Sequence, residues 1–593
     1  MTADQGLLIA VLVAAMVLFV WGRWRFDLVA VGALTACALL GLVPMDEAFT
    51  GFGHPAVVLV AIVLAITRAF VYSGVIDRTA TLLGRIGKGQ ITQMMALTGL
   101  AAVLSMFINN VGALALIMPV AIHAARSGGY PPGRLLMPVA FGSILGGMVT
   151  LIGTPPNIIV STFRPEAEGG AFGMFDYAPV GLAVLGAGLV FILLIGWRLL
   201  PQRHRPTDDG ELFEIGDYVT ELRVLDDSPM IGLTLAQFEN EVSPRPQALG
   251  ITRDGQVGVS RGRLDHIRAG DILLLGINPQ DLPTTAKTAG LELVPDPEGL
   301  ADRLRGDEQT LVEAVVAPGS RIIGRTAGGL MLRRRLGVNL IAIAREGTPI
   351  KRRLREVQFR AGDVLLVQTD ADALSDTLRL MGCLPLAERD LRVSSQVNVL
   401  PIVIFAAGIA AAATGFVTAP VALLAALIAI VLAGQLPLRE VYDAIDWPVI
   451  ILLGAMIPVG EALSHTGATD LIADEVARLV GTLPLWVAIG AVMIVTMTLS
   501  DIMNNAATAV VMAPISIGLA EELAVDPDAF LMAVAVGASC AFLTPIGHQN
   551  NTLIMGPGGY RFGDYWRMGL PLEIVVVIVA VPMIMLVWLP GSL

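Results

Sequence analysis

The sequence predicts an α-helical polytopic membrane protein in which two membrane-embedded halves flank a soluble α+β insert. Of its 593 residues, 55% are hydrophobic and 15% are charged, and the mean hydropathy is +0.72. Soluble globular domains are far less apolar than this. Apolar runs fill residues 6–200 and 396–590, whereas residues 201–392 are charged and alternate in the manner of short strands. We therefore expect four regions, namely a membrane repeat at 1–200, soluble lobes at 201–300 and 301–392, and a second membrane repeat at 393–593.

The apolar runs predict about ten transmembrane helices, since each crossing needs roughly 20 residues and shorter runs are accommodated by snorkelling flanks. The first run is followed by Arg23 and Arg25 and then by a second run at Leu28–Val43, which favours a retained helix over a signal peptide. The runs lie near 6–20, 26–43, 55–72, 135–160, 179–199, 397–415, 419–434, 448–464, 529–555 and 570–590.

Several classes of protein are excluded by composition. Three scattered cysteines, Cys37, Cys383 and Cys540, suit neither a disulfide framework nor a thiolate metal site. The six histidines have no metal-ligand spacing, and a net charge of −12 gives no indication of a nucleic-acid partner. No nucleophile, base and oxyanion set can be assembled from the motifs, so we do not expect an enzyme.

The two membrane halves carry the same motifs at a nearly constant offset. SMFINNVGALALIMP from Ser105 corresponds to SDIMNNAATAVVMAP from Ser500, an offset of 395. TLIGTPPN from Thr150 corresponds to TPIGHQNN from Thr544, an offset of 394. A fixed offset over separate motifs indicates an internal duplication.

Charge bias predicts the orientation of the chain. Arg23 and Arg25, Arg126 and Arg134, and the basic residues around Arg198 fall on one side if the amino terminus is outside the cell. By the positive-inside rule, that side is cytoplasmic. The soluble insert then begins and ends in the cytoplasm, so the second repeat is inverted relative to the first. We expect a multi-pass protein of the inner (plasma) membrane.

Polar residues interrupt the apolar runs at matching places in both repeats. For the charge-based orientation to hold along the whole chain, residues 93–125 and 484–520 must each enter and leave the membrane on the same face. Each segment has two arms of about a dozen residues, which are too short to span the membrane twice. We therefore expect re-entrant hairpins. Their tips carry Asn109-Asn110 and Asn504-Asn505, and the prolines of Gly153-Thr154-Pro155-Pro156-Asn157 break a helix. Non-helical backbone at membrane depth is tolerated only inside protein or beside water. Paired hairpins and broken helices in inverted repeats are typical of secondary transporters.

At these motifs the chain resembles the divalent anion/sodium symporter family. GTPPN matches the family's first broken helix, and TPIGHQNNTLIMGPGGYRFGDY is similar to the subgroup that carries a soluble insert and includes sulfate transporters. The family has Ser-Asn-Thr at each tip. Here the matching positions are Asn109-Asn110-Val111 and Asn504-Asn505-Ala506, so the central Asn is kept twice and both flanking hydroxyls are lost.

The resemblance implies Na⁺-coupled symport of a small divalent anion by alternating access, with sulfate ahead of a dicarboxylate, in a homodimer. The Na⁺ sites that it implies are formed by Ser105, Asn109, Asn110 and Gly153 in one repeat and by Ser500, Met503, Asn505 and Gly547 in the other. The implied anion-binding residues are Asn110, Val111, Thr154, Pro155, Asn505, Ala506, Thr508, His548 and Gln549. No arginine lies in either motif, so Na⁺ and helix amino termini would supply the positive potential.

The soluble insert is itself duplicated. MIGLTL at Met230 and IIGRTA at Ile322, and RAGDILLLG at Arg268 and RAGDVLLVQ at Arg360, keep an offset of 92. The lobes resemble the carboxy-terminal lobe of TrkA-type potassium-uptake regulators. No GxGxxG opens a βαβ unit, so NAD binding is not implied. A gate that senses a small regulatory ligand, a dimer clamp and an assembly module without a ligand all remain open.

Two alternative functions also remain open at this point. A Na⁺/H⁺ or oxyanion antiporter of the same superfamily would use Asp501 or His548 to carry the proton. An ion channel gated by the TrkA-like lobes belongs to another class, and both the broken-helix repeats and the lack of a TVGYG-type filter argue against it.

Overall fold

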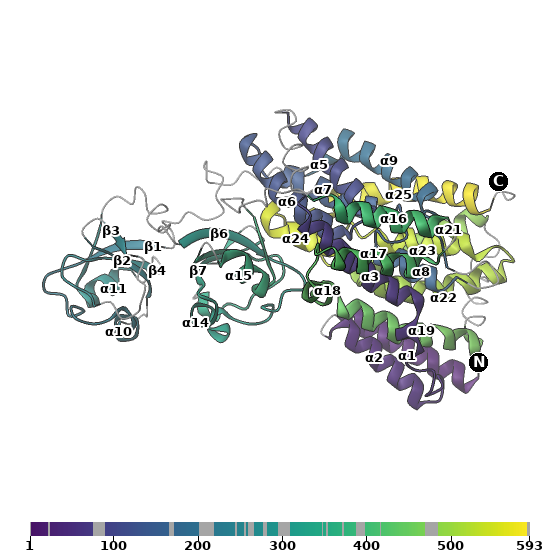
Figure 1. Ribbon diagram of the computed structural model, residues 1–593, viewed down its shortest axis with the longest axis horizontal. Coiled ribbons are helices and arrows are strands. Elements are labelled where there is room, and N and C mark those ends of the chain that lie inside the picture. The colour runs from purple at the N-terminus through teal and green to yellow at the C-terminus, as the bar shows by residue number, and fades with distance from the viewer. Residues whose placement is uncertain are drawn as a thin grey trace. The chain divides into compact units, whose positions relative to one another are not determined.

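The computed structural model describes residues 2–589 in two compact units (Figure 1). One unit comprises Met1–Gln202, Asp390–Asn551 and Arg561–Leu593, and the other comprises Arg203–Arg389 and Thr552–Tyr560. The segments that fall outside the described residues are 22–23, 75–88, 165–170, 201–218, 243–245, 254–255, 259–265, 277–281, 295–308, 347, 351–353, 371–372, 387–397, 415–416 and 469–483. The predicted boundaries at 200/201, 300/301 and 392/393 adjoin or fall within these segments.

In its described residues, the regular elements of the first unit are all helices. Its amino-terminal half contains α1 (Ala3–Trp21), α2 (Phe26–Leu39), η1 (Thr50–Gly53), α3 (Pro55–Tyr72), α5 (Gln90–Ser105), α6 (Asn110–Ser127), α7 (Gly133–Gly147), α8 (Pro155–Thr162), α9 (Ala178–Leu194) and η3 (Gly196–Arg198). Its carboxy-terminal half contains α16 (Leu400–Ala413), α17 (Ala419–Leu432), α18 (Leu438–Ala444), α19 (Trp447–His465), α21 (Leu485–Ile502), α22 (Asn505–Glu522), α23 (Pro527–Ser539), η6 (Phe562–Asp564) and α25 (Trp566–Trp588). The helix α24 (Gln549–Gly558) begins in this unit, and its residues from Thr552 on are assigned to the other unit.

Three of the described helices are long and apolar enough to cross a membrane, namely α6, α21 and α25. The bent pair α18–α19 adds a fourth if it is counted as one span, and nine further apolar helices are shorter. Many apolar helices of this kind make the chain a multi-pass membrane protein.

The arms of the two hairpins are longer than the sequence led us to expect. The arms α6, α21 and α22 have 18 residues each and α5 has 16, so the expectation of arms of about a dozen residues was wrong. The helices continue past the apolar stretch around each Asn pair, to polar ends such as Gln90 and Arg126. Length alone therefore does not exclude that α6 or α21 spans the membrane.

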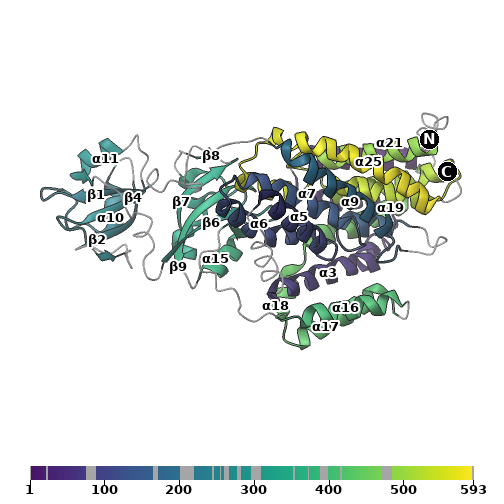
Figure 2. The ribbon, with the colours of Figure 1, turned by 90° about the horizontal axis from the view of Figure 1, so that it is seen from above.

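The helices of the first unit form two packed groups in the described part of the chain. One group contains α1–α3 and α16–α19, and the other contains α5–α9, α21–α23 and α25. The start of α24 is tied to the second group by the hydrogen bond from Asn550 Nδ2 to Ser143 Oγ on α7. Figure 2 shows α16 and α17 side by side next to α3, within the first group. The main contacts between the groups are those of α3 with α8 and of α19 with α22. Each group draws helices from both halves of the sequence.

The second unit contains two five-stranded antiparallel sheets with the same strand order. The first sheet is β3-β2-β4-β1-β5, and the second, starting from the edge strand β8, is β8-β7-β9-β6-β10. The strands are β1 (Val219–Val224), β2 (Gln247–Arg253), β3 (Gln256–Gly258), β4 (Ile272–Gly276), β5 (Leu291–Leu293), β6 (Gln309–Val316), β7 (Asn339–Arg345), β8 (Thr348–Pro349), β9 (Val364–Asp370) and β10 (Cys383–Pro385). The short helices described beside them are α10 (Leu235–Glu241), α11 (Leu282–Ala289), α13 (Ala327–Leu330), α14 (Leu332–Leu336), η5 (Leu354–Glu356) and α15 (Leu374–Met381).

Equivalent residues of the two lobes make the same hydrogen bond. Ser228 Oγ donates to the carbonyl of Ala289 at 2.6 Å, and Ser320 Oγ donates to that of Met381 at 2.5 Å. Both residues of each pair differ by the offset of 92 found in the sequence. The contact fixes the turn after the first strand of each lobe against the end of its helix.

The second lobe is also held by a buried ion pair. Arg345, at the end of β7, donates from Nε and Nη2 to the two carboxylate oxygens of Asp363 at 2.7 and 2.8 Å. The Asp363 side chain is fully buried, and the pair raises the pKa of Arg345 by hydrogen bonding and charge attraction. A bidentate pair of this kind is one of the stronger polar contacts available to a protein.

Removing the Arg345 side chain should destabilise the second lobe, because the buried carboxylate of Asp363 would lose its counter-ion. We expect Arg345→Met to cost about 3 kcal/mol. Arg379→Met is the matched control, since Arg379 pairs with Asp376 at the surface and should cost no more than about 0.5 kcal/mol. Hydrogen exchange of the β9 amides measures both changes. Equal protection of β9 in the two variants would contradict the role given to this pair.

Candidate functional site

Each hairpin of the second helical group brings a helix carboxy terminus against a helix amino terminus. In the first hairpin α5 ends at Ser105 and α6 begins at Asn110, and in the second α21 ends at Ile502 and α22 begins at Asn505. The side chain of Asn109 caps α6 by accepting from Val111 N at 3.1 Å, and Asn504 caps α22 by accepting from Ala506 N at 2.9 Å. Carbonyl ends favour cations and amide ends favour anions. Both kinds of end are present at each tip.

The two broken helices are stabilised by matching contacts. Asn157 Nδ2 donates to the carbonyl of Thr150, and Asn551 Nδ2 donates to that of Thr544, both at 2.9 Å. These amides bridge the breaks between α7 and α8 and between α23 and α24, where intrahelical hydrogen bonds are missing. A tyrosine hydroxyl then donates to the carbonyl of each Asn, from Tyr177 at 2.7 Å and from Tyr565 at 2.6 Å.

A glycine at each break lies directly against the carbonyl at the end of the neighbouring hairpin arm. A Cβ added to Gly153 would lie 2.9 Å from the Ser105 carbonyl oxygen, and one added to Gly547 would lie 2.5 Å from that of Ser500. No side chain other than hydrogen fits at these distances. The backbone of the break therefore lies close to a hairpin carbonyl in both repeats, and carbonyl oxygens are the kind of ligand that a hard cation takes.

The predicted site residues divide by burial. Buried are Ser105, Asn110, Gly153, Thr154, Ser500, Met503, Ala506, Thr508, Gly547 and His548; Asn109, Val111, Pro155 and Asn505 are half-buried; and Gln549 is exposed. Asn505 Oδ1 accepts from Ala506 N at 2.9 Å, and its amide is partly accessible. The Ser500 hydroxyl points away from its predicted partners and donates to the carbonyl of Ala538 at 2.6 Å.

One polar network joins the two repeats through residues far apart in the sequence. Asn110, at the first tip, contacts Ser105 and lies 3.2 Å from His548 Nε2 of the second broken helix. Asn550 Nδ2 donates to Ser143 Oγ at 2.6 Å and to the Asn110 carbonyl at 3.3 Å. Sequence analysis predicted Asn110 and His548 but missed Asn550 and Ser143. Asn550 lies in the recognised motif, whereas Ser143 lies in an apolar helix with no motif around it.

A second acid lies next to Asp501 and was also missed. Asp501 Oδ1 accepts from Leu543 N at 2.9 Å, and Glu573 Oε1, on α25, accepts from Phe542 N at 3.4 Å. The two carboxyl groups contact each other, and both side chains are buried. Nothing in the apolar sequence around Glu573 indicates this pairing.

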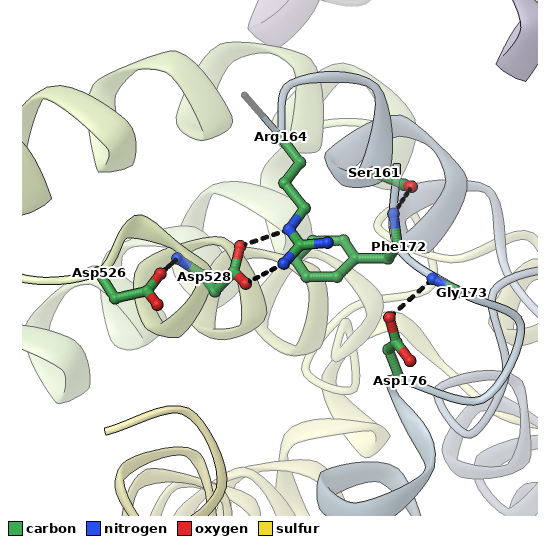
Figure 3. Close-up of polar contacts among 7 residues, drawn as sticks. All are labelled: Ser161, Arg164, Phe172, Gly173, Asp176, Asp526 and Asp528. Atoms are coloured by element: carbon green, nitrogen blue, oxygen red, sulfur yellow. Dashed lines mark hydrogen bonds and ion pairs between the residues drawn. The ribbon is translucent and has the colours of Figure 1, made fainter. Parts of the chain in front are cut away.

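An ion pair links the end of α8 to the first turn of α23 (Figure 3). Arg164 donates from Nε and Nη2 to both carboxylate oxygens of Asp528, at 2.8 and 2.6 Å, and stacks on the ring of Phe172 at 4.6 Å. This pair holds together the two broken helices, which come from opposite repeats. Asp526 caps α23 by accepting from Asp528 N at 2.8 Å.

Comparisons with known proteins identify relatives of the whole chain. The family described as citrate transporter matches residues 16–537. The uncharacterized transporter sll0640 of Synechocystis is 31% identical over 98% of this chain and 97% of its own length, and the uncharacterized transporter YfbS of Escherichia coli is 30% identical over 97% and 98%.

Other similarities are partial or distant. The sodium/sulfate cotransporter 2 of Chlamydomonas reinhardtii is 30% identical over 45% of this chain and 32% of its own length. The solved structure of the YdaH transporter of Alcanivorax borkumensis aligns with 98% of this chain and 99% of its own chain. The sequence identity is 12% and the TM-score is 0.46, a similarity too distant to assign residues.

Adding a methyl group at either break should disturb the site. Gly153→Ala and Gly547→Ala place a Cβ against the backbone of the hairpin arm, and overpacking of this kind typically costs about 1–3 kcal/mol. We expect transport to fall about tenfold in each variant. Gly186→Ala, on α9, is the control because nothing lies within 4 Å of its added Cβ. Wild-type transport in both break variants would exclude a tight fit there.

Proposed function

Because this chain belongs to the citrate transporter family, we propose that it is a Na⁺-coupled symporter of a small divalent anion. It is a multi-pass membrane transporter and not an enzyme. Sulfate is the preferred candidate substrate and a dicarboxylate the next. We place the protein in the inner (plasma) membrane, with its amino terminus outside and its soluble lobes in the cytoplasm.

The observation that carries this proposal is the pairing of hairpin and break in both halves of the chain. In each half, a glycine of the broken helix lies against a carbonyl in the last turn of the first hairpin arm, Gly153 against Ser105 and Gly547 against Ser500. Carbonyl and amide oxygens are suitable ligands for Na⁺. Two cation sites at the carbonyl ends would leave the amide ends of α6 and α22 free to attract an anion.

The anion itself would lie near the amino termini of α6 and α22. Neither motif contains an arginine or a lysine, so a divalent anion would be neutralised by bound Na⁺ and by helix dipoles. Binding of the anion would then depend on Na⁺, which is the physical basis of symport. Sulfate is placed first because relatives in Chlamydomonas reinhardtii are named sodium/sulfate cotransporters.

The two helical groups of the first unit suit alternating access. The two groups contact each other mainly through α3 with α8 and α19 with α22. Few helix–helix contacts would therefore change if one group moved against the other. Both hairpins and both broken helices belong to a single group, and Arg164 and Asp528 tie its two halves together. We propose that this group carries the site as one body.

Proton-coupled exchange is the second candidate, and the contact between Asp501 and Glu573 favours it. The position that corresponds to Asp501 in the first repeat holds Met106. Counted from the equivalent tyrosines Tyr177 and Tyr565, the position that corresponds to Glu573 holds Leu185, so the fold does not require acids there. Two buried carboxyl groups in contact are costly unless a positive charge neutralises one of them. That charge would be a proton in an exchanger.

Uptake into proteoliposomes separates the two candidates. Labelled sulfate and succinate are offered under an inward Na⁺ gradient at equal pH, or under a pH gradient without Na⁺. We expect sulfate to accumulate only with the Na⁺ gradient, because Na⁺ provides the charge that the site lacks. Uptake that is unchanged when K⁺ replaces Na⁺ would contradict symport, and transport driven by the pH gradient alone would favour the exchanger.

The side chain of Asn505 tests the proposed anion site. A hydrogen bond to a charged group contributes about 1.5–3 kcal/mol, so Asn505→Ala should lower the affinity for the anion about tenfold or more. Ser516→Ala is the control, since this buried hydroxyl on the same helix donates to the carbonyl of Ala513, one turn earlier, at 2.8 Å. The concentration of sulfate that gives half-maximal uptake measures the effect. An unchanged value in Asn505→Ala would remove this residue from the site.

A further inference from the structure

The two soluble lobes carry the same RAGD turn, but only one of these turns is covered. Its glycine is Gly270 in the first lobe and Gly362 in the second, with φ of +80° and +81°. The backbone N of each glycine donates at 2.9 Å to the equivalent carbonyl of its lobe, that of Val224 or Val316. Gly270 is nevertheless exposed, whereas Gly362 is buried. Some other part of the chain therefore lies on the turn of the second lobe.

That part is the second broken helix, α24, whose residues Thr552–Tyr560 belong to the same compact unit as the lobes. A Cβ added to Gly362 would lie 2.8 Å from the Thr552 carbonyl oxygen. Conversely, a Cβ added to Gly556 would overlap the Gly362 carbonyl oxygen and lie 3.0 Å from Val364 Cγ2. At Gly270, an added Cβ meets no described atom within 4 Å. Two glycines thus bring the backbones of α24 and the second lobe into direct contact.

The first turn of α24 lies in the proposed transport site. Asn550 Nδ2 donates to Ser143 Oγ at 2.6 Å, and Asn551 Nδ2 bridges the break to the Thr544 carbonyl at 2.9 Å. Thr552 follows Asn551 directly, and Gly556 lies roughly 7.5 Å farther along the axis at the usual rise of an α-helix. A displacement at the lobe contact is therefore passed to the site within two turns of helix.

The far end of α24 lacks the support that its counterpart has. In the first repeat, the end of α8 is held by the ion pair of Arg164 with Asp528. The position that corresponds to Arg164 holds Gly558, at the offset of 394, so α24 has no such ion pair. Its end also reads Gly556-Pro557-Gly558, and glycine and proline are the weakest helix formers. Packing on the second lobe supplies what this end of the helix does not have by itself.

We propose that the second soluble lobe anchors the second broken helix and thereby sets the affinity of the transport site. The proposal rests on the Na⁺ coupling proposed above, because Gly547 and the amino terminus of α24 belong to that site. Gly362 is then a positioning residue, which contacts neither cation nor anion. Displacing its turn from α24 lowers the affinity for Na⁺, so a signal received by this lobe reaches the site without entering the membrane.

The position of Gly362 is fixed from inside its lobe. The next residue, Asp363, accepts from Arg360 N at 2.8 Å and pairs with Arg345 at the end of β7. The core of the second lobe therefore holds the turn that contacts α24. Because the turn of the first lobe has the same conformation without this cover, we assign the anchoring role to the second lobe alone.

Gly362→Ala and Gly270→Ala form a matched pair for testing this role. Both place alanine at a positive φ and strain their turns equally, but only Gly362→Ala inserts a methyl group against α24. Sulfate uptake by the full-length protein in proteoliposomes is measured against Na⁺ concentration. We expect the Na⁺ concentration for half-maximal uptake to rise about fivefold or more in Gly362→Ala, within the usual range of coupling between sites. It should stay at the wild-type value in Gly270→Ala.

Gly556→Ala approaches the same contact from the helix and leaves the sequence of the lobe intact. Alanine is the better helix former, so this change would strengthen an α24 that stood alone. Because the new Cβ overlaps the Gly362 carbonyl oxygen, we expect half-maximal uptake to need more Na⁺, as in Gly362→Ala. Wild-type Na⁺ dependence in both variants would overturn the inference. So would a lower maximal rate at an unchanged half-maximal Na⁺ concentration, which indicates only loss of folded protein.

Hydrogen exchange separates this inference from the symport proposal. Deuterium uptake over Thr552–Tyr560 should quicken in Gly362→Ala and keep its wild-type rate in Gly270→Ala. Equal exchange in these two variants would overturn the anchoring role, whether or not transport requires Na⁺. Sulfate uptake by the wild-type protein that does not depend on Na⁺ would overturn symport, and the exchange of Thr552–Tyr560 would still decide whether the lobe holds α24.

Discussion

The structure depends on one constraint, which is that backbone groups released by breaks in apolar helices must find partners inside the protein. Lipid offers none, and each unpaired group costs several kcal/mol, on the order of 2–7. The amides of Asn157 and Asn551 meet this demand by bridging the two breaks, and Tyr177 and Tyr565 fix those residues in turn. With the breaks stabilised, each hairpin tip keeps a helix carboxy terminus with free carbonyl groups next to a helix amino terminus with free amide groups.

The repeats share this framework but differ in the polar groups placed upon it. The first repeat has Met106 and Leu185 where the second has Asp501 and Glu573, and Thr154 where the second has His548. The common backbone contacts are the basis on which we propose a cation site in each half. The unequal side chains give the two sites different neighbours, so we expect them to differ in affinity and in order of filling.

The sequence predicts the structure best where a motif repeats in both halves, and least where side chains from helices of opposite halves contact each other. The constant offset placed both Asn pairs and both breaks, because Gly, Pro and Asn have local conformational effects that leave a pattern in sequence. The sequence motifs did not indicate that Glu573 contacts Asp501, or that Arg164 pairs with Asp528, 364 residues away. Such pairs are set by packing between distant helices. The arm lengths were also missed, since helices extend beyond their apolar stretch when their polar ends reach water.

The central claim is that cation and anion occupy one coupled site, and thermodynamic coupling must be reciprocal. The most direct measurement is uptake of radioactive Na⁺ into proteoliposomes that have equal Na⁺ on both sides and an inward sulfate gradient. The account predicts transient accumulation of labelled Na⁺ above equilibrium, driven by sulfate. Uptake of labelled Na⁺ that does not change with a gradient of either sulfate or succinate would contradict the account.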